Sequence, residues 1–174
     1  SRPRCSDMFS FAALFSCREL MIFAQYTNTR EEVLAAVRQD GMALKHFFEF
    51  RSDKEVVLAA VTEDGYALEH ASPAMCRDKE VVLAAVTQDG NALYWADDAL
   101  QGNKEVVLAA VAQYGHALNC ASDELRNDKE VVLKAVAQEG CALEFASDEL
   151  RNDKEVVLKA VARHGLVTCK SYPG

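Results

Sequence analysis

The 174-residue chain contains little proline and little glycine, with three and eight of these residues respectively. Collagen-like, linker-rich and turn-rich β architectures depend on them, so the composition argues against all three. Lys and Arg are also in the minority, because 19 of them face 27 Asp and Glu for a net charge of -8. Nucleic-acid binding needs clustered Lys and Arg to contact phosphates, so we expect no nucleic-acid partner for this acidic chain.

The sequence also lacks the short motifs that mark catalytic and metal sites. GxSxG, GxGxxG, Walker A and HExxH are all absent. The four histidines stand singly, no CxxC occurs, and the six cysteines at 5, 17, 76, 120, 141 and 169 show no repeating interval. We therefore expect no enzymatic activity, no cofactor and no metal, with most cysteines acting as small buried hydrophobic residues. Their even number leaves pairing open in an oxidising compartment.

No apolar run is long enough to cross a membrane. The longest uninterrupted run covers residues 8–17, which is ten residues, whereas a spanning helix needs about 20. Apolar residues make up 50% of the chain and charged residues 26%, which predicts a packed, soluble protein. The chain starts at Ser1 without an initiator methionine or a purification tag, and one hypothesis is that it belongs to a native multi-protein particle.

A repeated unit dominates what is there. Gly65, Gly90, Gly115, Gly140 and Gly165 lie 25 residues apart, and Gly41 precedes Gly65 by 24. The blocks that lead to these glycines are REEVLAAVRQDG, KEVVLAAVTEDG, KEVVLAAVTQDG, KEVVLAAVAQYG, KEVVLKAVAQEG and KEVVLKAVARHG. In most units the glycine begins G-x-A-L, followed by a second alanine and then by Met or Leu. Such self-similarity is the signature of a repeat architecture.

Each unit predicts two short helices. An Asp or Asn stands at the N-cap position at 53, 78, 103, 128 and 153, and Thr29 with Glu32 matches a capping box. We expect the first helix to end at the glycine, in the left-handed C′ conformation. The second helix, shorter than two turns, spans G-x-A-L-x-x-A, and Ser-Asp-Glu-Leu at 122–125 and 147–150 starts a further turn.

The run VVLAAV makes the first helix apolar almost all round, so it must be covered on several sides. A stacked array provides this cover from the preceding unit, the following unit and the second helix. We therefore predict an all-α protein, a right-handed α-solenoid of two-helix repeats of 25 residues with a divergent N-terminal cap. A leucine-rich-repeat-like horseshoe with VVLAAV as a buried strand is the alternative, but its asparagine-containing pattern is missing and the paired alanines disfavour a strand.

The repeated unit D-K-E-V-V-L-A-A-V-x-x-x-G-x-A-L-x-x-A-S-x-x-L-R-x-D resembles the tandem repeats called domain of unknown function 4116. That family is frequent in algae, other protists and some of their large viruses. The resemblance implies a helical repeat array and brings no known enzymatic activity. The first unit departs most, because His46-Phe47-Phe48-Glu49-Phe50 replaces the usual A-S-x-x-L stretch and is one residue short.

The predicted organisation is an apolar cap at 1–28 and a repeat array at 29–174. We expect the units at about 29–52, 53–77, 78–102, 103–127, 128–152 and 153–174. The cap carries the aromatic residues Phe9, Phe11, Phe15 and Phe23. It either packs on the first repeat, or forms a protein-docking surface through these rings, or, least favoured, is a signal or membrane helix.

The candidate partner-binding surface lies where the units differ from one another. Variation concentrates at one, four and five residues after each glycine, and helical spacing puts these positions on one side of the second helix. The residues chosen are Tyr66, Glu69, His70, Asn91, Tyr94, Trp95, His116, Asn119, Glu144 and Phe145, with Cys120 and Cys141 at the same positions. Stacking would align them into a stripe centred on Tyr94 and Trp95. The alternative for Trp95 and Phe145 is that they fill gaps between repeats.

These features predict a non-enzymatic protein–protein interaction or scaffold module whose partners are other protein subunits. An accessory or linker subunit of a larger complex is the sharper form, and a photosynthetic or respiratory assembly of an alga or protist is one natural home. In that setting the protein would lie within an organelle, peripheral to a membrane complex. A free adaptor that recognises a peptide or RNA, one repeat per recognition unit, is the alternative, although the acidic charge argues against RNA.

Overall fold

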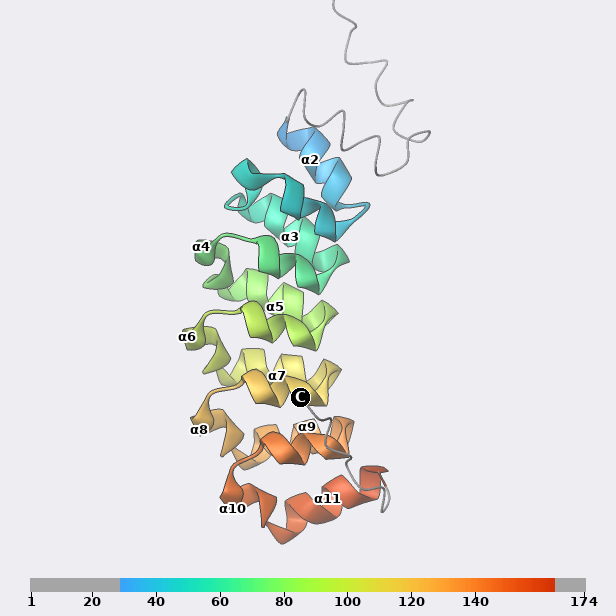
Figure 1. Ribbon diagram of the computed structural model, residues 1–174, viewed down its shortest axis with the longest axis vertical. Coiled ribbons are helices and arrows are strands. Elements are labelled where there is room, and N and C mark those ends of the chain that lie inside the picture. The colour runs from blue at the N-terminus through green and yellow to red at the C-terminus, as the bar shows by residue number, and fades with distance from the viewer. Residues whose placement is uncertain (1–28, 165–174) are drawn as a thin grey trace, which may run out of the picture.

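The computed structural model describes residues 29–164. Every regular element in that range is a helix, and the helices stack into an elongated array (Figure 1). The predicted cap at 1–28, with Phe9, Phe11, Phe15 and Phe23, and the final residues 165–174 lie outside the described range. Within residues 29–164 no helix combines the length and the hydrophobicity that a membrane span requires.

The first layer consists of one long α-helix from each repeat. These helices are α2 (Arg30–Val37), α3 (Lys54–Glu63), α5 (Lys79–Gln88), α7 (Lys104–Gln113), α9 (Lys129–Gln138) and α11 (Lys154–His164). Their N-caps are the ones predicted: Asp53 Oδ1 accepts from the amides of Glu55 and Val56 at 3.0 and 3.3 Å, and Asp78, Asp128 and Asp153 repeat this geometry. Each cap satisfies amides that would otherwise lack a partner at the helix start.

The second layer consists of 3-10 helices, which begin at the repeated glycine. They are η2 (Gly41–His46), η4 (Gly65–His70), η5 (Gly90–Trp95), η6 (Gly115–Cys120) and η7 (Gly140–Phe145). The acidic residue before the glycine caps several of them: Asp64 accepts from the Tyr66 amide at 2.9 Å and Asp89 from the Asn91 amide at 2.8 Å. The second helix of the predicted unit is thus present in the tighter 3-10 form.

A third element, a single helical turn, closes each of the four middle units. These turns are α4 (Pro73–Cys76), α6 (Asp98–Gln101), α8 (Asp123–Arg126) and α10 (Asp148–Arg151), and they line one edge of the array (Figure 1). In the first unit the short 3-10 helix η3 (Phe48–Phe50) takes this place. The description of each unit as two helices was therefore incomplete. The further turn that was expected at Ser-Asp-Glu-Leu forms a separate, third helical element.

The core lies between the two layers. Each middle long helix packs against its two neighbours, against its own 3-10 helix and against the 3-10 helix of the preceding repeat. The sides of α5 that carry Val81, Val82, Ala85 and Val86 are consequently fully buried, as is Leu93 of η5. The expectation that VVLAAV is covered on several sides is confirmed. This burial supplies the main driving force for stacking one repeat on the next.

The repeated glycine has a different role from the one predicted. Gly65 and Gly115 do not lie in the left-handed region, and the helices α3, α5, α7 and α9 each end in extended backbone at the residue before the glycine, as at Asp64 with φ -144° and ψ 112°. A Cβ on Gly65 would lie 2.6 Å from the carbonyl oxygen of Ala85 in the next repeat. Glycine is required because two repeats approach closely at this point, and the left-handed C′ prediction was wrong.

Polar ladders join neighbouring repeats along the surface. Lys54 Nζ lies 2.7 Å from Asp78 Oδ2 and 2.8 Å from Glu80 Oε2 of the next repeat. Lys104 and Lys129 repeat this contact in their own units, and Arg30 does so in the first. The repeated Lys-Glu pair lies at the surface and ties the N-terminal end of each long helix to the next one.

A groove between two aromatic clusters on the 3-10 layer

The outer face of the 3-10 layer pairs residues of neighbouring repeats in a fixed register. The residue directly after the glycine of one repeat meets the residue five positions after the glycine of the next. Tyr66 and Trp95 pair in this way with ring centroids 4.9 Å apart and an interplanar angle of 67°. His116 and Phe145 do the same at 5.4 Å and 65°. Such edge-on ring contacts stabilise the junction between repeats.

Each pair is extended by one more ring. Tyr94 lies edge-on to Trp95 at 5.5 Å and 88°, which completes a first cluster on η4 and η5. Tyr114 stacks on His116 at 5.3 Å and 21°, which completes a second cluster on η6 and η7. We call these the Trp95 cluster (Tyr66, Tyr94 and Trp95) and the His116 cluster (Tyr114, His116 and Phe145).

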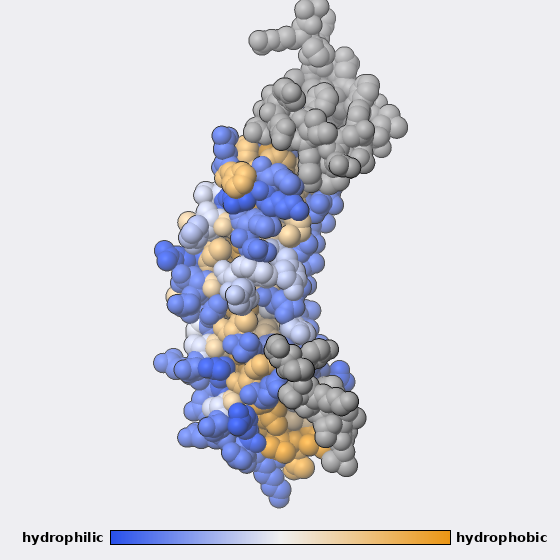
Figure 2. Space-filling model, in the orientation of Figure 1, coloured by the Kyte–Doolittle hydropathy of each residue, from blue (hydrophilic) through white to orange (hydrophobic). Residues whose placement is uncertain are grey.

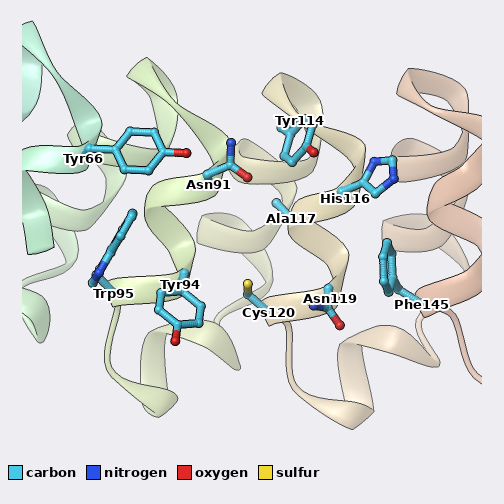
Figure 3. Close-up of a pocket in the computed structure, with 10 residues that line it drawn as sticks. All are labelled: Tyr66, Asn91, Tyr94, Trp95, Tyr114, His116, Ala117, Asn119, Cys120 and Phe145. Carbon is cyan, nitrogen blue, oxygen red and sulfur yellow. The ribbon is translucent and has the colours of Figure 1, made fainter. Parts of the chain in front are cut away.

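The junction between the two clusters carries no aromatic pair. Asn91 and Cys120 occupy the paired positions there, and their small side chains leave a groove of about 370 Å³. Figure 3 shows the Trp95 cluster on one side of this groove and the His116 cluster on the other. The groove is lined by Tyr66, Asn91, Tyr94, Trp95, Tyr114, His116, Ala117, Asn119, Cys120 and Phe145.

One wall of the groove exists because Tyr114 interrupts the acidic series before the glycines. Asp64 and Asp89 occupy this position in the two preceding repeats and cap their 3-10 helices, whereas Tyr114 provides no side-chain cap for η6. Glu139 of the following repeat takes over, since its Oε2 accepts from the His116 amide at 3.2 Å and also contacts His116 Nδ1. The tyrosine is therefore accommodated by a compensating carboxylate from the neighbouring repeat.

The surroundings of the groove are acidic. The segments η4 to η7, together with the residue before each, contain the carboxylates Asp64, Glu69, Asp89, Glu139 and Glu144 and no Lys or Arg. Burial, followed by the charge of Glu139, raises the pKa of Tyr114 above its ordinary value. Carboxylates thus outnumber Lys and Arg on the 3-10 segments around the groove.

The lining residues differ in how far they reach into the core. Tyr94 is 68% exposed and Tyr66 37%, so both offer free ring surface to solvent. Trp95, Cys120 and Phe145 are half-buried and pack against the hydrophobic core. Burial accordingly raises the pKa of the Cys120 thiol, which favours its neutral form.

The structure brings most of the predicted surface residues into this one groove. Tyr66, Asn91, Tyr94, Trp95, His116, Asn119 and Phe145 all line it. Glu69 and Glu144 are exposed on the same layer but are not part of the lining, and neither is His70. Burial lowers the pKa of His70 and favours its neutral form. Trp95 and Phe145 pack against the core, as the gap-filling alternative predicts, and they also line the groove; their part in partner binding stays a prediction.

Sequence reasoning did not select three of the lining residues as site residues, Tyr114, Ala117 and Cys120. Ala117 belongs to the G-x-A-L pattern that recurs in most units and carries no signal of its own. Tyr114 stands before Gly115, where the four other repeats that carry a described 3-10 helix have Asp or Glu before the glycine. That break in the acidic series is the signal that could have identified it.

Fold and surface together define a helical-repeat protein with a variable outer face. A model of the family described as Domain of unknown function (DUF4116) matches five overlapping stretches, residues 29–76, 53–101, 78–126, 103–151 and 128–169. The chain belongs to this family. The search of curated proteins finds no match, and neither does the search of solved structures.

Proposed function

We propose that the protein is a non-enzymatic interaction module that docks other protein subunits on its 3-10 layer. The observation that carries this proposal is the groove between the Trp95 and His116 clusters, built from the positions that vary between otherwise nearly identical repeats. Tyr and Trp are enriched among residues that dominate binding energy at protein interfaces. Solenoids commonly bind partners along an extended surface formed by equivalent positions of successive repeats.

The long-helix layer is a weaker candidate for such docking. The exposed charges at the N-terminal ends of its helices are engaged in the ladder of ion pairs between repeats, such as Lys54 with Asp78 and Glu80. Exposed pairs of this kind contribute little specificity to a partner, because water and salt screen them. The 3-10 layer instead offers exposed rings at Tyr66 and Tyr94.

The sharper form of the proposal is an accessory or linker subunit of a larger complex, within an organelle and peripheral to a membrane. A photosynthetic or respiratory assembly is one such complex. The alternative is a free adaptor that recognises a peptide, for which the groove would serve equally well. The right-handed sense of the superhelix and the 25-residue unit length remain predictions.

The mass of the particle that contains the protein tests whether the protein is a subunit of a larger complex. The protein is extracted gently from cells that naturally contain it, and the particle is sized by native mass spectrometry. We expect a mass far above the 19.2 kDa of this chain, with fixed stoichiometry. A free monomer would contradict the subunit form and favour the peptide-binding adaptor.

A further inference from the structure

We propose that the groove receives a positively charged Arg or Lys side chain from a partner polypeptide. The inference rests on the proposed docking function and names the chemistry of the partner. Its basis is the combination of aromatic walls, exposed carboxylates on the neighbouring 3-10 helices and the lack of Lys and Arg in the four 3-10 segments η4 to η7.

The walls of the groove suit a cation. Tyr66, Tyr94 and Trp95 on one side and Tyr114 and Phe145 on the other supply ring surfaces along an open groove (Figure 3). The negative face of an aromatic ring attracts an ammonium or a guanidinium group, and a planar guanidinium also stacks on it. The same attraction occurs within this protein, where the Arg51 guanidinium carbon lies 4.0 Å from the centroid of the Phe48 ring.

The charges around the groove act in the same direction. Glu69 and Glu144 occupy the same repeat position as the lining residues Tyr94 and Asn119, one repeat before and one repeat after them. Both carboxylates are exposed. They attract a basic segment that crosses the groove along the array and repel an acidic segment or a nucleic-acid backbone.

The centre of the groove can also accept hydrogen bonds. The side-chain nitrogen Nδ2 of Asn91 donates to Asp89 Oδ1 at 3.1 Å. The side-chain oxygen Oδ1 of Asn91 can then act as an acceptor. A guanidinium or ammonium group has donors and no acceptor, so it matches this oxygen. The volume of about 370 Å³ lies near the lower end of the range of about 300 to 1,000 Å³ for ligand pockets and suits one side chain with its flanking backbone.

Trp95 allows a direct test, because it is the single tryptophan of the chain and lines the groove. The full chain is titrated with the peptide acetyl-Gly-Arg-Gly-Arg-Gly-amide while Trp95 fluorescence is followed. We expect a saturable change. The same peptide with citrulline, the neutral isostere of Arg, is expected to bind about tenfold more weakly because the cation–π and carboxylate attractions are lost.

Two sets of variants test whether the Arg peptide binds in the groove. Asn91→Tyr with Cys120→Phe builds a third ring pair at the register already used by Tyr66 with Trp95 and by His116 with Phe145. We expect this variant to keep its circular dichroism spectrum and to lose the fluorescence response. Glu69→Gln with Glu144→Gln is expected to weaken binding about threefold, whereas the charge-matched control Glu124→Gln with Glu149→Gln on α8 and α10 leaves it unchanged.

Each contrary result overturns the inference. An absent response to the Arg peptide, equal binding of the citrulline peptide, or full binding by a folded groove-filled variant would show that the groove does not select a cation. If Arg2→Gln, Arg4→Gln and Arg18→Gln together raise the peptide affinity about tenfold, the chain's own N-terminal segment is the occupant and the partner assignment fails. If the Arg peptide does not bind but the native particle has a high mass, the cation specificity of the groove is refuted while the proposed docking function stands.

Discussion

The two layers of the array differ sharply in how much they vary. In the long-helix layer the block K-E-V-V-L recurs unchanged in α3, α5, α7, α9 and α11, and its valines face the core in the middle repeats. On the outer face of the 3-10 layer the equivalent residues are Glu69, Tyr94, Asn119 and Glu144, all exposed and nearly all different. Neighbouring positions on one backbone framework are thus under very different physical requirements.

This difference shows which positions of a repeat are free to become specific for a partner. A buried position in a stacked repeat must satisfy the same neighbours every time, so its identity is dictated by packing. An exposed position on the 3-10 layer has no such constraint, and a change there costs little stability. Asn91 with Cys120 and Tyr66 with Trp95 occupy the same register, yet one pair opens a groove and the other closes a junction.

We expect the largest loss of stability from a substitution where the two layers meet. Gly115→Ala would place a Cβ 2.7 Å from the carbonyl oxygen of Ala135 and 2.9 Å from the Glu139 Cβ, so the next repeat must shift. We expect the free energy of unfolding to fall by about 3 kcal/mol, as in overpacked cores. Urea denaturation followed by circular dichroism measures it.

Gly102→Ala is the matched control for this substitution. Its added Cβ would meet nothing closer than 3.6 Å, at the carbonyl oxygen of Asp98. We expect no loss of stability and a gain of about 0.5 kcal/mol, because alanine restricts the unfolded chain more than glycine does. Equal losses for Gly115→Ala and Gly102→Ala would refute the close approach of repeats as the reason for the glycine.

The next largest loss of stability distinguishes two adjacent residues of η5, Trp95 and Tyr94. Trp95→Ala removes a half-buried ring that packs against the core and against Tyr66, so we expect a loss of about 2 kcal/mol in the free energy of unfolding. Tyr94→Ala removes a ring that is 68% exposed, and we expect a loss below about 0.5 kcal/mol. The two variants are compared by urea denaturation. A larger loss for Tyr94→Ala would reverse the assignment of core and surface on this helix.

A smaller effect is expected at the caps of the long helices. Asp78→Ala removes the cap of α5 and the contact with Lys54, and we expect a loss of about 1 kcal/mol. Asp78→Asn keeps the cap and removes only the charge, which reproduces the natural arrangement at Asn103 of α7, where Lys79 pairs with Glu105 alone. We expect this second variant to lose less than about 0.5 kcal/mol. Equal losses in thermal unfolding would show that the cap contributes nothing.

The mildest prediction concerns acid. The contacts with Lys54, Lys104 and Lys129 hold the pKa values of Asp78, Asp128 and Asp153 below their ordinary value of 3.8. Because the folded pKa is depressed, the stabilisation is present above about pH 4 and is lost as the pH falls through the lower folded values. The free energy of unfolding, measured between pH 6 and pH 2, is expected to decline mainly below about pH 4. A decline centred near pH 6 would implicate histidines instead.

Much of the fold follows from the sequence, because stacking repeats the same requirement. The periodic glycines, the Asp at each N-cap and the run VVLAAV determine the helical array and its buried faces, as at Asp53 and Val56. The role of Gly65 could not be derived, since the close approach involves Ala85, a residue of another repeat. The 3-10 geometry and the Lys54 ladder likewise depend on how one repeat sits on the next.

The site could be predicted only as a set of positions. Variation within the chain selected Tyr66, Tyr94 and Trp95, and the structure places them around one groove. The groove itself depends on the offset that brings Asn91 opposite Cys120, which spacing along a single helix does not reveal. Tyr114 was missed as a site residue because it precedes the glycine, outside the variable positions that were considered.

Site-specific photo-crosslinking tests the central claim, that partners dock on the 3-10 layer, most directly. A benzophenone side chain replaces Tyr94 in one variant and the exposed Lys134 of α9 in the other, and both are expressed in cells that naturally contain the protein. We predict that irradiation at position 94 yields a discrete cross-linked protein whose amount exceeds that at position 134 by about tenfold. A stronger cross-link at position 134 would contradict this account and move the docking surface to the long-helix layer.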